Sequence, residues 1–307
     1  MLTNWQLTPE LRSLAVTKIN EVTSRIPEDV AHIQKWLTQQ SHLNARTDDQ
    51  WILNFLRGCK FSLDRTKEKL DNFYTVRSAL PEFFGKRDPL SPEIQHILKL
   101  GLFLPIDTKV GPKIFLVRTA NIDPTHVSLI DITKVCLMIT DIILNEDDYC
   151  VIQGQRFLVD FSAFNKNQLL RVTPTLCQKA ILCLKDVYPC RLKGFYIINM
   201  HPIFESIINV GKVIMGKKLG SRVVAYSKDN AQSLYDNIPK SALPADYGGE
   251  GETIEALTVK WKTKVESYRD MFLEDAKYGC DERKRIRKSV LSEHFGIEGS
   301  FRKLDID

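Results

Sequence analysis

The 307-residue sequence lacks any apolar run of the 18 or so residues that a membrane-spanning helix needs. No basic segment followed by an apolar stretch comes after Met1, so we expect no secretory signal. Its seven cysteines are irregularly spaced, and no CxxC or Cys/His cluster indicates a zinc site. Reduced thiols in a cytoplasmic protein are the resulting expectation.

The sequence also lacks the common catalytic sequence motifs. The chain has no G-x-S-x-G, no G-x-x-x-x-G-K-[ST] and no H-E-x-x-H, and Gly216-Lys217-Lys218 lacks the Gly-rich lead-in of a phosphate loop. A nucleophile needs a base within reach, and His201 before Pro202 has no evident partner. We therefore expect no enzyme, no catalytic residue, no metal and no cofactor.

Charge of one sign is not in large excess. Lys and Arg number 43 against 38 Asp and Glu, a formal net charge of +5. This balance permits attraction to anionic surfaces, but no interleaving of basic and aromatic residues indicates a nucleic-acid groove. The densest basic run, at residues 283–288, lies in a charged helical tail that follows Gly249.

The first 90 residues show helical periodicity only. Apolar residues recur at helical spacing over residues 8–41, with an expected break near Pro27. Further helices are predicted at 48–56 and at 63–80, the latter preceded by Ser62. The pattern predicts a helical N-terminal unit.

The pattern then alternates between short β-rich runs and longer helical stretches. Strands are predicted at residues 113–118, 156–160, 194–199 and 221–226. The helices predicted between them span residues 124–145, 166–187 and 203–217. Strand, long helix, strand is typical of parallel crossovers, so the pattern predicts an α/β fold.

Four ordered segments resemble the CRAL-TRIO family of lipid-binding proteins over about residues 10–260. They are residues 54–61, 157–161, 188–204 and 243–249. The resemblance implies a helical N-terminal bundle followed by an α/β domain, whose mostly parallel sheet floors an apolar cavity under a mobile lid helix. The implied divisions are 1–90 for the bundle, 91–260 for the lipid-binding domain and 261–307 for a helical, charged C-terminal extension.

The resemblance places the lid at about residues 202–216, where apolar residues lie on more than one helical face. One face would cover the cavity and the other would meet a membrane; a core helix buried on several sides is the alternative. The implied pocket residues are Cys136, Ile139, Thr140, Val159, Phe195, Ile197, Val210 and Ile214. For the residues on strands, an ordinary place in the hydrophobic core is the alternative to lining a pocket. For Thr140, the alternative is that its hydroxyl donates to a backbone carbonyl of its own helix.

A second implied site is basic. Residues that match a phosphoinositide-binding cleft of the family are Arg191, Lys193, Lys218 and Arg222, with Lys60 replacing an arginine that the family has at Cys59. Converging cations suit phosphates, although a solvated basic face is the alternative. Cys190 stands where a family member with an internal inositol phosphate has glutamate, which disfavours such a headgroup inside the pocket. The resemblance makes Asp160, at a strand end, structural.

The leading hypothesis is an intracellular carrier of a retinoid, tocopherol, carotenoid or similar terpenoid, exchanged at phosphoinositide-containing membranes. The alternatives are a phospholipid or phosphoinositide transfer or sensing protein, and a signalling scaffold whose basic tail binds a partner. We expect a cytoplasmic monomer that contacts membranes reversibly at their surface and does not bind nucleic acid.

Overall fold

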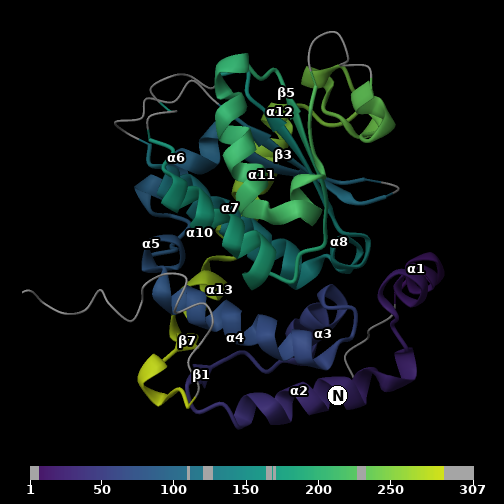
Figure 1. The fold of residues 1–307 in the computed structure, drawn as a ribbon, viewed down its shortest axis with the longest axis vertical. Coiled ribbons are helices and arrows are strands. Elements are labelled where there is room, and N and C mark those ends of the chain that lie inside the picture. Colours follow the sequence, from purple (N-terminus) through teal and green to yellow (C-terminus); the bar gives the residue numbers. More distant parts are fainter. Residues whose placement is uncertain are drawn as a thin grey trace, which may run out of the picture.

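The computed structural model of the protein describes residues 7–108, 111–119, 127–163, 168, 171–226 and 233–286. Figure 1 shows a sheet with its helices in the upper half of the view and a layer of N-terminal helices below it. No helix within these ranges is long and apolar enough to cross a membrane.

The N-terminal layer is built from capped helices. The Thr8 hydroxyl and the Asp48 carboxylate accept backbone N–H groups at the starts of the first and third helices. The elements are α1 (Pro9–Ile19), η1 (Thr23–Arg25), α2 (Ile26–Thr38), β1 (Leu43–Asn44), α3 (Asp49–Gly58), α4 (Leu63–Ala79) and α5 (Pro81–Phe84).

The predicted break near Pro27 is displaced, because this proline occupies the first turn of α2, where its missing N–H costs nothing. The chain turns instead at Asn20, whose backbone is left-handed with φ 62°.

The sheet has five strands in the order β2-β3-β4-β5-β6. Their bounds are β2 (Phe103–Ile106), β3 (Lys113–Arg118), β4 (Gln155–Asp160), β5 (Leu192–Ile198) and β6 (Val223–Ala225). The β2 strand is antiparallel to β3, and the remaining neighbours are parallel. This topology confirms the predicted α/β class with a mostly parallel sheet.

Helices precede the sheet and connect its parallel strands, and the alternation predicted those that follow β3. They are α6 (Pro92–Leu100), α7 (Leu129–Glu146), α8 (Asp148–Gln153), α10 (Pro174–Leu182) with the π-helical turn η2 (Cys183–Val187), and η3 (Pro202–Phe204) with α11 (Glu205–Gly220). The helix predicted from residue 166 begins at Pro174 in the structure, after the Thr173 cap; residues 166, 167, 169 and 170 lie outside the described ranges.

After η5 (Lys240–Ala242) and η6 (Ala245–Tyr247), the chain runs from the sheet to the N-terminal layer. Its elements are α12 (Ile254–Ser267), α13 (Arg269–Glu274), η7 (Asp275–Lys277), β7 (Gly279–Cys280) and η8 (Glu282–Lys284). The indole of Trp261 donates to the Pro105 carbonyl at 2.8 Å, and β7 pairs antiparallel with β1, Leu43 opposite Cys280. The C-terminal segment therefore contacts both layers, and the boundaries near residues 90 and 260 stay predictions.

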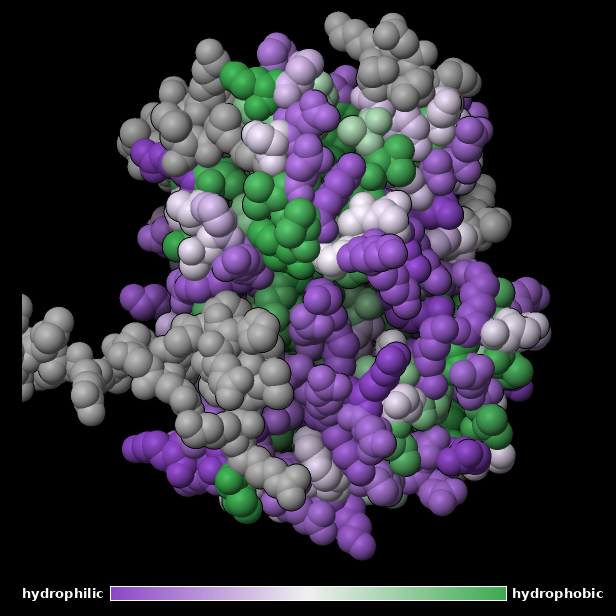
Figure 2. Space-filling view, in the orientation of Figure 1, coloured by the Kyte–Doolittle hydropathy of each residue, from purple (hydrophilic) through white to green (hydrophobic). Residues whose placement is uncertain are grey.

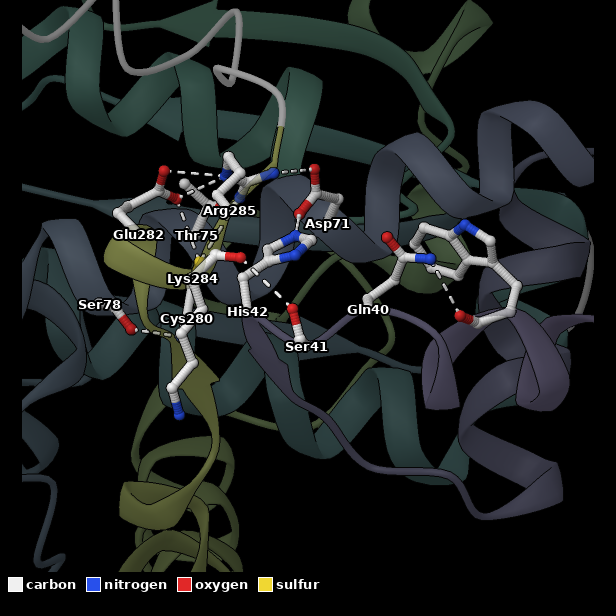
Figure 3. A network of polar contacts seen from close by, with 11 residues as sticks. Gln40, Ser41, His42, Asp71, Thr75, Ser78, Cys280, Glu282, Lys284 and Arg285 are labelled. Carbon is white, nitrogen blue, oxygen red and sulfur yellow. Dashed lines mark hydrogen bonds and ion pairs between the residues drawn. The ribbon is translucent and has the colours of Figure 1, made fainter.

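A polar network fastens this segment to α4 and β1, and we call it the C-terminal clasp: His42, Asp71, Thr75, Glu282 and Arg285 (Figure 3). The Arg285 guanidinium lies 2.6 Å from Asp71, 2.8 Å from Glu282 and donates to the Thr75 hydroxyl at 2.6 Å. Asp71 also bonds to the His42 ring at 2.9 Å. Every polar side chain of the clasp thus has a partner.

The clasp includes part of the basic run predicted at residues 283–288. Arg285 is only 6% exposed, and Arg283 and Lys284 pair with Asp281. Arg287 and Lys288 lie outside the described residues. A partner-binding role for Arg285 would therefore require the clasp to open.

A second paired cluster lies deeper, between the two layers. The buried Asp141 carboxylate of α7 lies 2.5 Å from Arg87 and 3.4 Å from Arg77, and it accepts the Tyr188 hydroxyl at 2.6 Å. Asp275, from the C-terminal segment, lies 3.1 Å from Arg77. Buried charges persist only when they are paired, so this group fixes the relative orientation of the segments that supply its members.

Candidate functional site

One face of the sheet carries a continuous apolar surface. Phe115, Phe157 and Phe195 lie opposite one another on three neighbouring strands, with ring centroids 5.3 and 4.9 Å apart. Two residues further along, Val159 pairs in register with Ile197. Side chains two apart on a strand share a face, so the structure brings the predicted floor residues Val159, Phe195 and Ile197 together.

Of the three pocket residues predicted on α7, Ile139 lies in the same apolar core, Cys136 packs against it, and Thr140 is buried. Cys136 and Ile139 line a small cavity of about 10 Å³ between α6, α7, β2 and α12. The Thr140 hydroxyl donates to the Cys136 carbonyl at 2.8 Å. The helix bond that sequence left open for Thr140 is thus formed, which occupies its proton but leaves its oxygen able to accept.

The predicted lid corresponds to η3 and most of α11, which lies in front of the sheet in Figure 1. Its outer face carries exposed apolar residues among polar ones: Val210 is 47% exposed and Val213 is 80% exposed. Figure 2 shows hydrophobic residues gathered over this helix with hydrophilic residues beside them. The structure therefore places Val210, which we predicted in the pocket, on the solvent side of α11.

The inner face of α11 meets the core. Met215 and Leu219 pack against it, and the predicted pocket residue Ile214 is half-buried beside them in sequence. The helix is kinked at Gly216, whose φ of 77° and ψ of 169° suit glycine alone. The kink separates the predicted lid from the final turn of the helix, which carries Lys217 and Lys218.

The predicted cations Lys60, Arg191, Lys193 and Arg222 form what we call the basic cluster. A close contact between the two layers positions the first of them. A Cβ on Gly58 would lie 2.2 Å from the Pro189 carbonyl, so only glycine allows this contact. The contact brings the turn after α3, where Lys60 has φ 56°, toward the segment that leads into β5. The motif at residues 54–61 thus positions a cation beside Arg191 and Lys193.

Arg191 and Arg222 are both held by backbone carbonyls. The Arg191 guanidinium donates to the Ile152 carbonyl and to the Lys18 carbonyl, the latter at 3.3 Å. Arg222 donates to the Leu192 carbonyl at 2.5 Å. These bonds orient the guanidinium groups without neutralising their charge.

Lys193 lies at the centre of the cluster. Burial and the positive charges of Arg191, Arg222, Lys18 and Lys60 lower its pKa to about 8. Lys60, Arg191, Lys193 and Arg222, all predicted for this site, therefore lie close enough together for their charges to interact. Lys218 is exposed on the final turn of α11.

The two cysteines that depart from the family pattern carry no charge into the cluster. Burial raises the pKa of Cys190 to about 11 and also raises the pKa of Cys59. Both thiols are therefore neutral at pH 7, and Cys190 does not replace the missing glutamate as a counter-charge.

Asp160 has a full set of structural partners. Its carboxylate accepts the Tyr247 hydroxyl at 2.6 Å, the Asn199 amide at 2.9 Å and the Ser162 backbone N–H at 2.9 Å. It joins the ends of β4 and β5 to the closing segment at residues 243–249, which explains why these motifs occur together. Among the described residues, no group of three His, Cys, Asp or Glu is arranged to hold a metal ion.

Sequence reasoning missed one member of the basic cluster, Lys18 of α1. Its ammonium donates to the Gln153 side chain at 2.8 Å, and its charge is among those that lower the pKa of Lys193. No spacing in the sequence connects the last turn of the first helix with residues 153 and 193.

Two family models match the chain. Residues 22–94 match the Pinta-like UBA domain, and residues 101–249 match the CRAL/TRIO domain. The protein belongs to the CRAL-TRIO family. That family comprises lipid-binding and lipid-transfer proteins.

Named relatives agree with this assignment. "Alpha-tocopherol transfer protein-like" of Homo sapiens is 26% identical over 85% of this chain and 76% of its own length. "Clavesin-1" of Xenopus laevis is 26% identical over 79% of this chain and 74% of its own. The crystal structure of Sfh5 aligns over 75% of this chain and 85% of that chain at 9% identity, with a TM-score of 0.40. The assignment rests on the sequence matches.

Proposed function

We propose that this protein carries a small hydrophobic ligand, a retinoid, tocopherol, carotenoid or similar terpenoid, and exchanges it at phosphoinositide-containing membranes. The observation that carries the proposal is the continuous apolar sheet face formed by Phe157, Phe195, Val159 and Ile197. Helix α11, which has apolar residues on both its inner and outer sides, lies in front of the sheet in Figure 1. The relative named for tocopherol transfer supports this ligand class.

Apolar burial supplies enough free energy for such a ligand. Each methylene removed from water contributes about 0.8 kcal/mol, so a terpenoid of roughly twenty carbons needs few polar contacts. Thr140 and Cys136 offer a weak acceptor and a weak donor on α7 to orient a single polar group.

The outer face of α11 supplies the membrane contact in this proposal. Val210 and Val213 would enter the lipid interface, while the unpaired cations of the basic cluster face the phosphate headgroups. Seven free cysteines suit the reducing cytoplasm, where we propose that the protein acts as a monomer.

Native mass spectrometry of the purified protein tests the ligand class. We expect a copurifying apolar ligand, or uptake of at least one member of a panel of retinoid, tocopherol, carotenoid and sterol. A protein that neither retains nor takes up any of these is not a carrier of this class. Transfer of phosphatidylinositol between vesicles, without terpenoid binding, would favour the phospholipid-transfer alternative.

A pair of surface substitutions tests the membrane contact. Val213→Asp places a charge on the outer face of α11 and should abolish most vesicle binding while leaving ligand uptake intact. Val259→Asp on α12 is the control, because Val259 is also an exposed valine, 60% exposed, on a different helix. Equal loss of vesicle binding in both variants would contradict the role given to α11.

A further inference from the structure

Helix α1 lies beside the basic cluster because it has its own small core. Ala15 and Ile19 of α1 are buried against Ile152 of α8, with Phe61 packed at the edge. Ile152 accepts a bond from Arg191, and Phe61 follows Lys60. Helix α1 therefore packs against Ile152 and Phe61, which also position Arg191 and Lys60 of the basic cluster.

Two short backbone stretches hold the cations around one place. At residues 152–154, Ile152 accepts from Arg191, the Gln153 side chain accepts from Lys18, and a Cβ on Gly154 would lie 3.0 Å from the side chain of Lys193. The stretch 191–193 carries Arg191 and Lys193, and Leu192 between them accepts from Arg222. Lys18 is thus bonded to the same stretch, residues 152–154, that holds Arg191 and contacts Lys193.

The cluster has no counter-charge of its own. Lys18, Lys60, Arg191, Lys193 and Arg222 form no ion pair with any carboxylate among the described residues, and both nearby thiols are neutral. One phosphate monoester carries only about 1.5 to 2 negative charges at neutral pH. A ligand with a single phosphate would leave most of this positive charge uncompensated.

We propose that α1 is a wall of the anion site and that Lys18 sets its preference for ligands carrying at least two phosphate groups. This inference rests on the proposed contact with phosphorylated lipids and adds to it a residue and a ligand charge class. Lys18 precedes both stretches matched by family models, residues 22–94 and 101–249. A lipid headgroup and a soluble inositol polyphosphate share the required chemistry.

Lys18→Ala in the full chain tests the proposal, with Arg12→Ala as the matched control. Arg12 is an exposed cation on the same helix, one with no side-chain partner among the described residues. The probes are phosphatidylcholine vesicles that contain phosphatidylinositol bisphosphate or, at equal total charge, the monophosphate. Soluble inositol trisphosphate, measured by calorimetry, separates a free ligand from a lipid headgroup.

We expect Lys18→Ala to weaken binding of the bisphosphate vesicles, the trisphosphate or both by about five-fold, the effect of one cation near a phosphorylated surface. Binding of the monophosphate should change less, so the preference for the second phosphate falls. Lys18→Arg should restore it, and Arg12→Ala should leave it unchanged. Equal losses in Lys18→Ala and Arg12→Ala, or no change in the preference, would overturn the proposal.

Terpenoid uptake by the same variants keeps the two proposals separate. Normal uptake with an unchanged phosphate preference would refute the role of Lys18 alone. Absence of terpenoid uptake in every variant, with the phosphate preference lost only in Lys18→Ala, would refute the carrier proposal and leave the anion site standing.

Discussion

In the C-terminal clasp, Arg285 lies between Asp71 and Glu282, whereas Arg191 and Arg222 in the basic cluster are held by backbone carbonyls and have other cations as neighbours. The two regions have similar side chains and opposite electrostatics. A paired cation stabilises the fold, and its removal exposes an unmatched carboxylate. An unpaired cation is retained at some cost to the fold, which is typical of functional sites. Substitution of one charge in each region should therefore have effects of opposite sign.

The largest effect is expected at the deepest paired group. Asp141→Ala removes one of the two carboxylates that pair with Arg77 and Arg87, which should lower the free energy of unfolding by about 3–5 kcal/mol. Urea denaturation measures it. Asp131→Ala on the same helix is the control, because Asp131 is half-exposed and pairs with Lys134 only at 4.0 Å. A loss below about 1 kcal/mol would show that the buried arginines find other partners.

The clasp should give the next largest effect. Arg285→Ala removes bonds to Asp71, Glu282 and Thr75, and we expect a loss of about 1–3 kcal/mol. Hydrogen exchange should show faster opening of β1 and β7 than of the central strands. Arg283→Ala is matched to it, since that side chain is 89% exposed. Unchanged protection of β1 would mean that strand pairing alone holds the segment.

Removal of a charge from the basic cluster should act in the opposite direction. Lys193→Ala relieves repulsion with Arg191 and Arg222, so the free energy of unfolding should stay unchanged or rise by less than about 1 kcal/mol. Binding of phosphoinositide vesicles should fall in the same variant. A clear loss of stability would contradict the comparison, because it would show that Lys193 supports the fold.

The smallest effect is a dependence on pH. The pKa of Lys193 is lowered to about 8 in the free protein, and a bound anion would raise it again. Binding therefore takes up a proton above that value, and affinity for inositol trisphosphate should fall as pH rises through about 8. The facing groups, Lys18, Lys60, Arg191 and Arg222, all act in the same direction. Lys193→Arg should flatten the profile between pH 7 and 9; an unchanged profile would assign the dependence to another group.

Much of the fold followed from local pattern. The β3, β4 and β5 strands are apolar runs bounded by turns, and α1 and α3 begin at the capping residues Thr8 and Asp48. The β2 strand escaped prediction because it is a short edge strand containing Pro105, and proline disfavours a strand in sequence. The pair β1 and β7 escaped because each has two residues, too few for any periodicity.

The basic cluster was predicted only in part. Arg191 and Lys193 alternate before a strand, and Lys60 follows a recognisable motif, so sequence could indicate them. A solvated basic face and an anion-binding site differ in whether carboxylates pair with the cations. Such carboxylates can come from anywhere in the chain, so the sequence could not distinguish the two. The same uncertainty applied to Arg285, which looked like a tail cation and is buried against Asp71.

The sequence by itself determined the N-terminal helices, the alternation of helices with β3 to β6, and the family, because hydrophobic period, caps and ordered motifs are local properties of the chain. Only the tertiary structure decided which cations are paired, that Val210 faces outward from α11, and that Lys18 joins Lys193. Electrostatic and packing partners are set by distance in space, and the contact of Gly58 with Pro189 and the docking of Ile19 on Ile152 create those distances.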